Sequence, residues 1–228
     1  MKKVLMITSA MAFGLAGAAN ADVVFEKGTF ALNLGLISGE DVSLFDVDAQ
    51  AAFTTGTLGF QLDGGMTGIT DFSDIESFGA FGVHFYKNTA SGAKFGAYLA
   101  NSYFVTQVGA EGMVSLGAFD VEGSAGIITE GYGPENIYNA TLDVYYGISD
   151  RIELNAGVNH LFDSNNSFTI FEVGGSYMLP NNDIALNIGY RSFDSESVID
   201  AGVSWSFGPN QDMRLFGKRG IDIFLFGA

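Results

Sequence analysis

The chain has 228 residues, of which 26 are acidic and only 10 are basic, so its net charge is −16. A polyanion of this size lacks the basic surface that nucleic-acid binding requires, which excludes nucleic acid as a partner. The absence of cysteine excludes a disulfide-stabilised extracellular domain. Glycine is frequent, with 31 residues, and proline is rare, with 3, which argues against a disordered or collagen-like chain.

Residues 1–21 have the pattern of a secretory signal peptide. A basic MKK start precedes an apolar stretch at 4–19, and the tripeptide ANA at 19–21 is a small-x-small cleavage site. A membrane-anchor helix is the alternative, but it needs about twenty apolar residues and usually lacks such an exit. We therefore expect a mature chain that begins at Asp22, with eight basic and 26 acidic residues and a net charge of −18.

After the signal peptide, short segments of alternating apolar and polar residues follow one another, separated by polar or glycine-containing turns. In DIALNIGYRS (183–192), for example, Leu186 and Ile188 lie on one face while Asn187 and Arg191 lie on the other. A period of two is typical of β-strands. The pattern predicts strands at 24–37, 43–53, 57–69, 77–87, 94–104, 110–118, 119–128, 137–148, 152–162, 168–179, 183–191 and 198–207.

The run of strands without helical periodicity predicts an all-β fold. We expect an antiparallel up-and-down barrel of about twelve strands, with ten or fourteen as alternatives. The connections TTG, SDR and PNN are short, whereas TDFSDIE, TEGYGPEN and FDSNNS are longer, which predicts tight turns at one rim and loops at the other. The barrel is expected to occupy 22–207 as one domain. Gly208-Pro209 then ends the last strand, and 208–228 forms a C-terminal tail.

Soluble and membrane barrels share this alternation but turn its two faces in opposite directions. Here the polar face consists mainly of small residues, and the whole region 22–207 contains only five basic ones: Lys27, Lys87, Lys94, Arg151 and Arg191. Aromatic residues gather near the expected strand ends, as in the girdles of membrane barrels, although they also favour strands in general. Near the long-loop rim they are Tyr138, Phe162, Phe168 and Tyr190; near the short-turn rim they are Tyr145, Tyr146, Trp205 and Phe207. A transmembrane β-barrel with its apolar face outward is therefore predicted.

The segment DAGVSWSFGPN (200–210) places Asp200, Gly202, Trp205 and Phe207 in the order found in the last strand of Gram-negative outer-membrane barrels. The chain resembles this family over essentially all of 22–207, with the proportions of a small porin. The resemblance implies location in the outer membrane, contact with its lipid and lipopolysaccharide, and recognition of these four residues by the barrel-assembly machinery. The family's signal strand usually ends the chain, whereas 21 residues follow here.

The tail segment KRGIDIFLFGA contains a second, weaker version of this signal. Because Gly208-Pro209 is a clear stop, we place the closing strand at 198–207. The tail at 208–228 is then expected in the periplasm.

Assigning the polar face to the lumen predicts a mainly acidic wall. The predicted pore-lining residues are Asp46, Asp48, Gln50, Asp63, Asp120, Glu122, Asp143, Glu153, Asn155, Asn187, Arg191 and Asp200. Lys27 and Lys94 are the other basic residues expected inside. An acidic wall favours the passage of cations. The same side chains would instead hydrogen-bond across a filled, closed lumen in a smaller barrel, and the sequence leaves both arrangements open.

Signatures of enzymes and metal sites are weak. The two histidines, His84 and His160, lie on different expected strands on or beside an apolar face, and no G-x-S-x-G element is present. The D-x-D-x-Q run at 46–50 imitates the start of a calcium loop, but Ala51 stands where that loop needs glycine. No catalytic residue, metal ligand or cofactor is therefore predicted, and the oligomeric state is left open.

The sequence predicts a porin-like channel for passive diffusion of small hydrophilic solutes, with a modest cation preference. A closed structural barrel whose acidic loops bind surface partners or lipopolysaccharide is the alternative. An outer-membrane lipid hydrolase, with His84 or His160 as its catalytic base, is the third reading and the least favoured.

Overall fold

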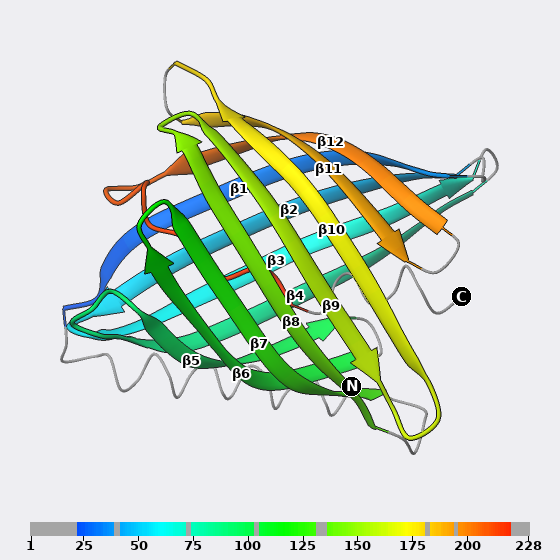
Figure 1. Ribbon diagram of the computed structural model, residues 1–228, viewed down its shortest axis with the longest axis horizontal. Coiled ribbons are helices and arrows are strands. Elements are labelled where there is room, and N and C mark those ends of the chain that lie inside the picture. Colours follow the sequence, from blue (N-terminus) through cyan, green and yellow to red (C-terminus); the bar gives the residue numbers. More distant parts are fainter. Residues whose placement is uncertain are drawn as a thin grey trace.

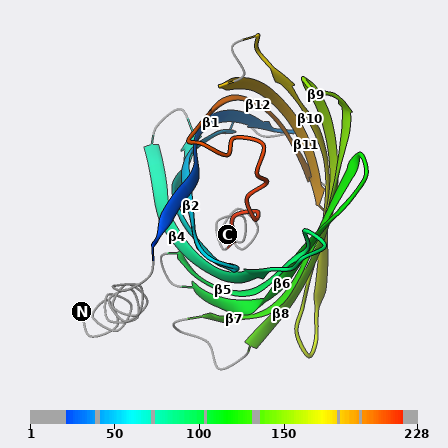
Figure 2. The ribbon, with the colours of Figure 1, turned by 90° about the vertical axis from the view of Figure 1, so that its left-hand side faces the viewer.

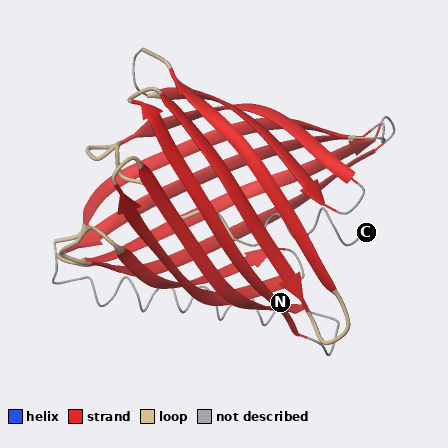
Figure 3. Ribbon diagram, viewed as in Figure 1, coloured by secondary structure: helices blue, strands red, loops and turns tan. Residues whose placement is uncertain are grey.

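The computed structural model describes residues 22–38, 42–71, 74–102, 105–130, 136–180, 183–193 and 196–219. Strands run through almost all of the ribbon that these residues form (Figures 1 and 3). The strands are β1 (Val24–Ile37), β2 (Val42–Thr55), β3 (Leu58–Asp71), β4 (Asp74–Asn88), β5 (Lys94–Ser102), β6 (Val105–Leu116), β7 (Phe119–Glu130), β8 (Asn136–Ser149), β9 (Ile152–Phe162), β10 (Ser167–Met178), β11 (Ile184–Phe193) and β12 (Glu196–Phe207). The predicted signal peptide lies outside the described residues. None of the described residues belongs to a helix long and apolar enough to cross a bilayer.

The twelve strands form a closed antiparallel barrel. Each strand pairs with its neighbours in sequence, and β1 pairs with β12 to complete the ring. In this seam Gly28 lies opposite Phe207, and Gly35 lies opposite Asp200. Closure leaves no free strand edge, so the backbone groups of every strand find partners on both sides. The predicted up-and-down barrel of twelve strands, with 198–207 in the closing strand, is confirmed.

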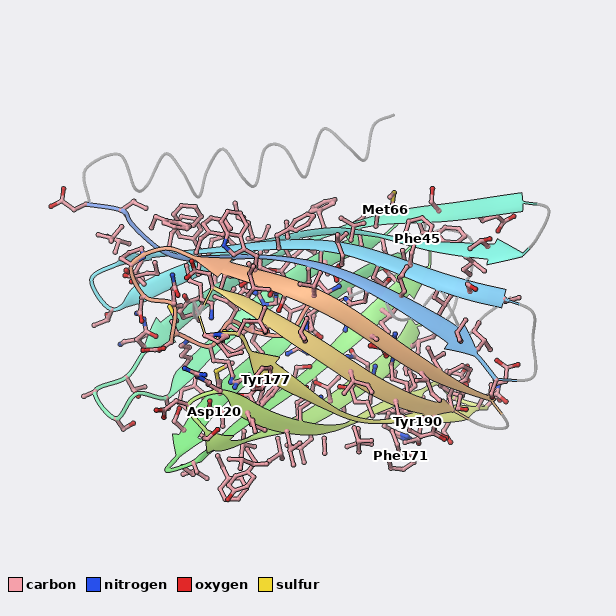
Figure 4. All side chains as sticks on the ribbon, turned by 90° about the horizontal axis from the view of Figure 1, so that it is seen from above. Phe45, Met66, Asp120, Phe171, Tyr177 and Tyr190 are labelled. Carbon is pink, nitrogen blue, oxygen red and sulfur yellow. The ribbon has the colours of Figure 1, made fainter. Side chains whose placement is uncertain are left out.

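The alternation in the sequence sorts the side chains into an apolar outer face and a largely polar inner one. In β1, for example, Leu34 is 71% exposed on the outside, whereas Asn33 on the adjacent position faces the interior. Figure 4 shows Phe171 and Tyr190 pointing away from the ribbon on its outer surface. Large apolar side chains that are exposed along nearly every strand give the barrel an outer surface unlike that of a soluble protein.

Two boundaries differ from the sequence prediction. Strand β6 begins at Val105, whereas the sequence pattern placed its start at 110. The pattern missed the first five residues because apolar Val105 and Met113 share a face with polar Gln107, which obscures the alternation. Strands β3 and β4 continue into the connection TDFSDIE, with Asp71 opposite Asp74, so this connection is short rather than long. Most of the connection TEGYGPEN falls outside the described residues.

Apolar side chains occupy part of the interior near the long-loop rim. Leu44, Ile170, Phe193 and Val198 are buried there, and the partly buried residues packed on them are Ile37, Ile69, Leu161 and Phe168. Phe168 had been predicted for the outer girdle, but its ring packs on Phe193 with 6.2 Å between centroids. We call these eight residues the inner apolar cluster. The interior is therefore apolar at one end and polar along the rest of its length.

Candidate functional site

The chain beyond β12 folds back into the barrel, where Figure 2 shows it as an orange-red segment within the ring of strands. Gly208 has a φ of 116°, a conformation that favours glycine, and it turns the chain at the short-turn rim. The N–H of Asn210 then donates to the carbonyl of Glu26 at 3.0 Å. The tail at 208–228 was expected in the periplasm, whereas its described part, 208–219, enters the lumen.

Phe216 is the most deeply buried residue of the described tail, with 1% of its surface exposed. Its ring lies parallel to that of His84, with 5.8 Å between centroids, and meets the Tyr86 ring at 5.4 Å, while Met113 packs against it. The Gln61 side chain binds the Phe216 backbone on both sides: its Nε2 donates to the carbonyl at 2.9 Å, and its Oε1 accepts from the N–H at 2.9 Å. The wall thus recognises both the ring and the backbone of this residue.

Arg214 joins the tail to two strands of the barrel wall. Its Nε donates to Asp120 Oδ2 at 2.9 Å, and its Nη2 donates to Glu153 on β9. The guanidinium also lies over the ring of Tyr145, 3.9 Å from its centroid, in a cation–π contact. Tyr145 had been predicted for the aromatic girdle, but it faces the lumen because it shares the inward face of β8 with Asp143.

The last two described residues of the tail are also basic and also bound to wall carboxylates. Arg219 pairs with Glu122, and its Nη2 lies 3.6 Å from Glu111 Oε2. The side chains of both glutamates are fully buried, and that of Arg219 is 6% exposed. Lys218 pairs with Asp48 in a more open position. Three basic tail residues therefore neutralise much of the acidic wall on one side of the lumen.

His84 lies beneath the Phe216 ring, on the inward face of β4. Its Nδ1 is 2.8 Å from Glu111 Oε1, and its Nε2 is 2.7 Å from Asp63 Oδ2. All three side chains are at most 4% exposed. Each ring nitrogen therefore has a carboxylate partner, and the histidine links β3, β4 and β6 under the tail.

On the side away from this contact, the lumen keeps a cavity of about 450 Å³, lined mainly by β8–β12 and β1–β2. Its polar lining residues include Asp46, Asn155, Glu172, Asn187, Arg191 and Asp200. A second cavity of about 400 Å³ lies between the tail and the short-turn rim. The interior is thus divided into a side filled by the tail and a side that is open and mainly acidic.

No protein-family model matches the chain, and no curated protein matches it. Solved structures do. The KdgM porin in complex with disordered oligogalacturonate aligns with a TM-score of 0.61 at 10% identity, over 78% of this chain and 99% of its own. The NanC porin aligns at 0.60 and 12% identity, over 77% and 98%. This chain has the fold of the small outer-membrane β-barrels. Outer membrane phospholipase A from Escherichia coli shares that fold at a TM-score of 0.55 and 12% identity, over 78% of this chain and 89% of its own.

All twelve residues predicted to line a pore lie on inward-facing positions of their strands. The structure divides them into two groups. Asp48, Gln50, Asp120, Glu122 and Glu153 bind the tail, and Asp63 binds His84 beneath it. Of the remainder, Asp46, Asn155, Asn187, Arg191 and Asp200 line the cavity that the tail leaves open, and Asp143 lies opposite Glu122 on the inward face of β8. Their role in a pore stays a prediction.

Sequence reasoning missed several wall residues, among them Gln61, Glu111 and Glu172, and the part played by the tail. All three of these side chains face inward. The alternation in β10 was sufficient to place Glu172 inside, because it shares a face with Gly174 and Ser176. For the tail the available signal was charge, since three of the chain's ten basic residues follow the closing strand of a barrel with an acidic wall.

The second histidine, His160, lies on the lipid-facing side of β9 near the long-loop rim. Its Nδ1 is 2.8 Å from the hydroxyl of Thr169, and its ring stacks on Phe162 at 5.5 Å. This is a position in an aromatic girdle, and we derive no hydrolytic step from it. Among the described residues, no group of three or more His, Asp or Glu side chains is arranged to hold a metal ion.

Proposed function

We propose that the protein is an outer-membrane channel through which small hydrophilic solutes diffuse passively, with a modest preference for cations. The observation that carries this proposal is the polar cavity of about 450 Å³ beside the tail, within a closed ring of strands. The apolar outer face suits contact with outer-membrane lipid and lipopolysaccharide, and a polar interior suits a water-filled path. The fold shared with solved porins supports the same function.

The cation preference rests on the wall that the tail leaves uncovered. Glu172 lines the open cavity there, and it faces Asp143 across Gly157, which has no side chain to separate them. Asp46 and Asp200 line the same cavity, whose basic residues are Arg191, 3.9 Å from Asp200, and Lys218, which pairs with Asp48. Carboxylates along a water-filled path raise the local concentration of cations.

Neutralising this wall should weaken the selectivity. In the variant Asp143→Asn with Glu172→Gln, we expect the reversal potential in a salt gradient across a planar bilayer to move toward zero by roughly half, because negative charge is lost beside the path. The preference of the unmodified protein should also weaken with salt, since charges are screened over about 10 Å at 0.1 M.

Asp163→Asn is the matched control for this measurement. Asp163 lies in the exposed β9–β10 loop, where its Oδ1 accepts hydrogen bonds from two backbone N–H groups at 2.6 Å, which an amide oxygen can also accept. The control removes a charge outside the lumen and should leave the reversal potential unchanged. An anion preference in the unmodified protein would contradict the assignment of the conducting side.

A closed structural barrel is the second candidate, and one observation favours it. The inner apolar cluster occupies the interior near the long-loop rim, and apolar constrictions can exclude water and ions from a pore. In that case the acidic loops would provide the function by binding surface partners or lipopolysaccharide. A complete absence of conductance in a protein that remains folded would favour this candidate over the channel.

Location provides a separate test. The mature protein should fractionate with outer membranes and migrate faster in a gel before heating than after it, because a closed sheet resists detergent until heated. An epitope tag in the 131–135 connection should be reached by antibody on intact cells, whereas a tag between Pro209 and Asn210 should not. Recovery as a soluble periplasmic protein would contradict the proposal.

A further inference from the structure

We propose that the lumen wall formed mainly by β1–β7, with Glu153 of β9, is a peptide-binding site whose tethered ligand is the chain's own segment 211–219. The ligand class is a basic peptide with one aromatic side chain, and its bound form acts as a plug that narrows the channel. The channel-narrowing part of this inference rests on the proposed function, whereas the binding site does not depend on it.

The first argument is the way in which the wall holds the segment. Wall lysines bind its backbone carbonyls: Lys27 Nζ donates to Gln211 at 2.6 Å, and Lys94 Nζ donates to Arg214 at 2.6 Å. Wall carboxylates bind its side chains, and Gln61 binds both backbone groups of Phe216. Donors of the wall thus meet acceptors of the segment, and acceptors of the wall meet its donors, as expected for a ligand in a matched site.

The second argument is that the barrel is complete without this segment. The ring closes through β1 and β12, and residues 211–219 belong to none of its strands. The tail can therefore leave the lumen without breaking a hydrogen bond of the sheet. The link to β12 is accessible, because Pro209, Asn210 and Asp212 are exposed while Phe216 and Arg219 are buried.

The third argument concerns the space that the segment occupies. Arg214 binds Asp120 on β7 and Glu153 on β9, whereas Lys218 pairs with Asp48 on β2, so the tail contacts different sides of the ring rather than lying along one strand. It lies between the wall of β1–β7 and the cavity of about 450 Å³. Release of the tail would add its own volume to that cavity and uncover the acidic wall beneath it.

The test uses the full chain with a protease recognition sequence inserted between Pro209 and Asn210. The chain has no cysteine, so Met113→Cys introduces a single thiol under the Phe216 ring. Before cleavage, we expect slow reaction with a water-soluble maleimide. After cleavage and washing, the reaction should be at least tenfold faster, and a synthetic peptide with the sequence QDMRLFGKR should restore protection. The same peptide with Phe216→Ala and glutamine at its three basic positions should not.

Asn187→Cys is the matched control for reagent entry, because this side chain faces the open cavity on the opposite wall. Its thiol should react at the same rate before and after cleavage. If the Met113→Cys thiol is equally slow before and after cleavage, or if the peptide gives no protection, the peptide-binding site is refuted.

Conductance of the same cleaved protein separates this inference from the proposed channel. We expect cleavage to raise single-channel conductance at least twofold and added peptide to reverse the rise from the short-turn side only. Conductance unaffected by cleavage while the thiol becomes reactive would overturn the plug. No conductance in either form, with peptide protection intact, would refute the channel while supporting the binding site.

Discussion

Replacing Arg219 with methionine should lower the thermal stability of the folded protein more than the same change at any other basic residue of the tail. The substitution leaves Glu122 and Glu111 fully buried without their guanidinium partner. Breaking a buried ion pair by removing one member costs about 3–5 kcal/mol, because the remaining charge loses its ionic partner without gaining water. Glu122 keeps the hydrogen bond from the Gly217 N–H, and Glu111 keeps its contact with His84. The measurement is the temperature at which the fast-migrating folded band converts to the unfolded band.

Two further variants identify the cause of that loss. Lys218→Met removes a cation whose side chain is 26% exposed beside Asp48, so its loss should cost less than about 1 kcal/mol. Arg219→Met combined with Glu122→Gln removes both charges of the pair and should recover part of the stability. A midpoint for Arg219→Met equal to that for Lys218→Met would contradict the buried position of Arg219.

The strands and the direction of their faces could be predicted from the sequence because they depend on local alternation. In the middle of β11 and β12, apolar residues alternate with small or polar ones and point outward, so Ile188 and Val203 are exposed while Asn187 and Ser204 face the lumen. Such a pattern fixes which side of a strand a residue occupies whatever the rest of the chain does. Agreement is poorest where the pattern fails, as in β6.

Alternation carries no information about contacts between the wall and a segment that is not a strand. The tail therefore looked like an extension outside the barrel, although its basic residues complement the acidic wall. Tyr145 was misassigned because its place near a strand end suggested an aromatic girdle. It alternates in β8 with outward residues, so its side chain faces the lumen and contacts Arg214. Charge complementarity, considered over the whole chain, was the available guide to the tail.

Among the residues of the predicted assembly signal, Phe207 makes aromatic contacts across the seam between β12 and β1. Its ring lies over Gly28 of β1, stacks on that of Phe25 at 5.9 Å between centroids, and meets that of Trp205 at a tilt at 4.9 Å. Phe25 in turn packs on Phe53 of β2 at 5.5 Å. These rings span β12, β1 and β2 on the outer surface, where the first and last strands must find one another.

Phe207→Ala should therefore reduce the amount of assembled protein several-fold, because it removes side-chain contacts across the seam and one residue of the segment that we expect the barrel-assembly machinery to recognise. The measurement is the heat-modifiable band in isolated outer membranes, relative to total protein. Phe95→Ala is the matched control, since Phe95 is also an exposed aromatic residue near the short-turn rim and also lies over a glycine, Gly112, but it belongs to β5, away from the seam. Loss of a girdle ring alone would lower both variants equally, and that result would remove the reason to place the signal in β12. A deficit confined to Phe207→Ala would instead show that closure of β12 on β1, rather than lipid contact in general, limits assembly.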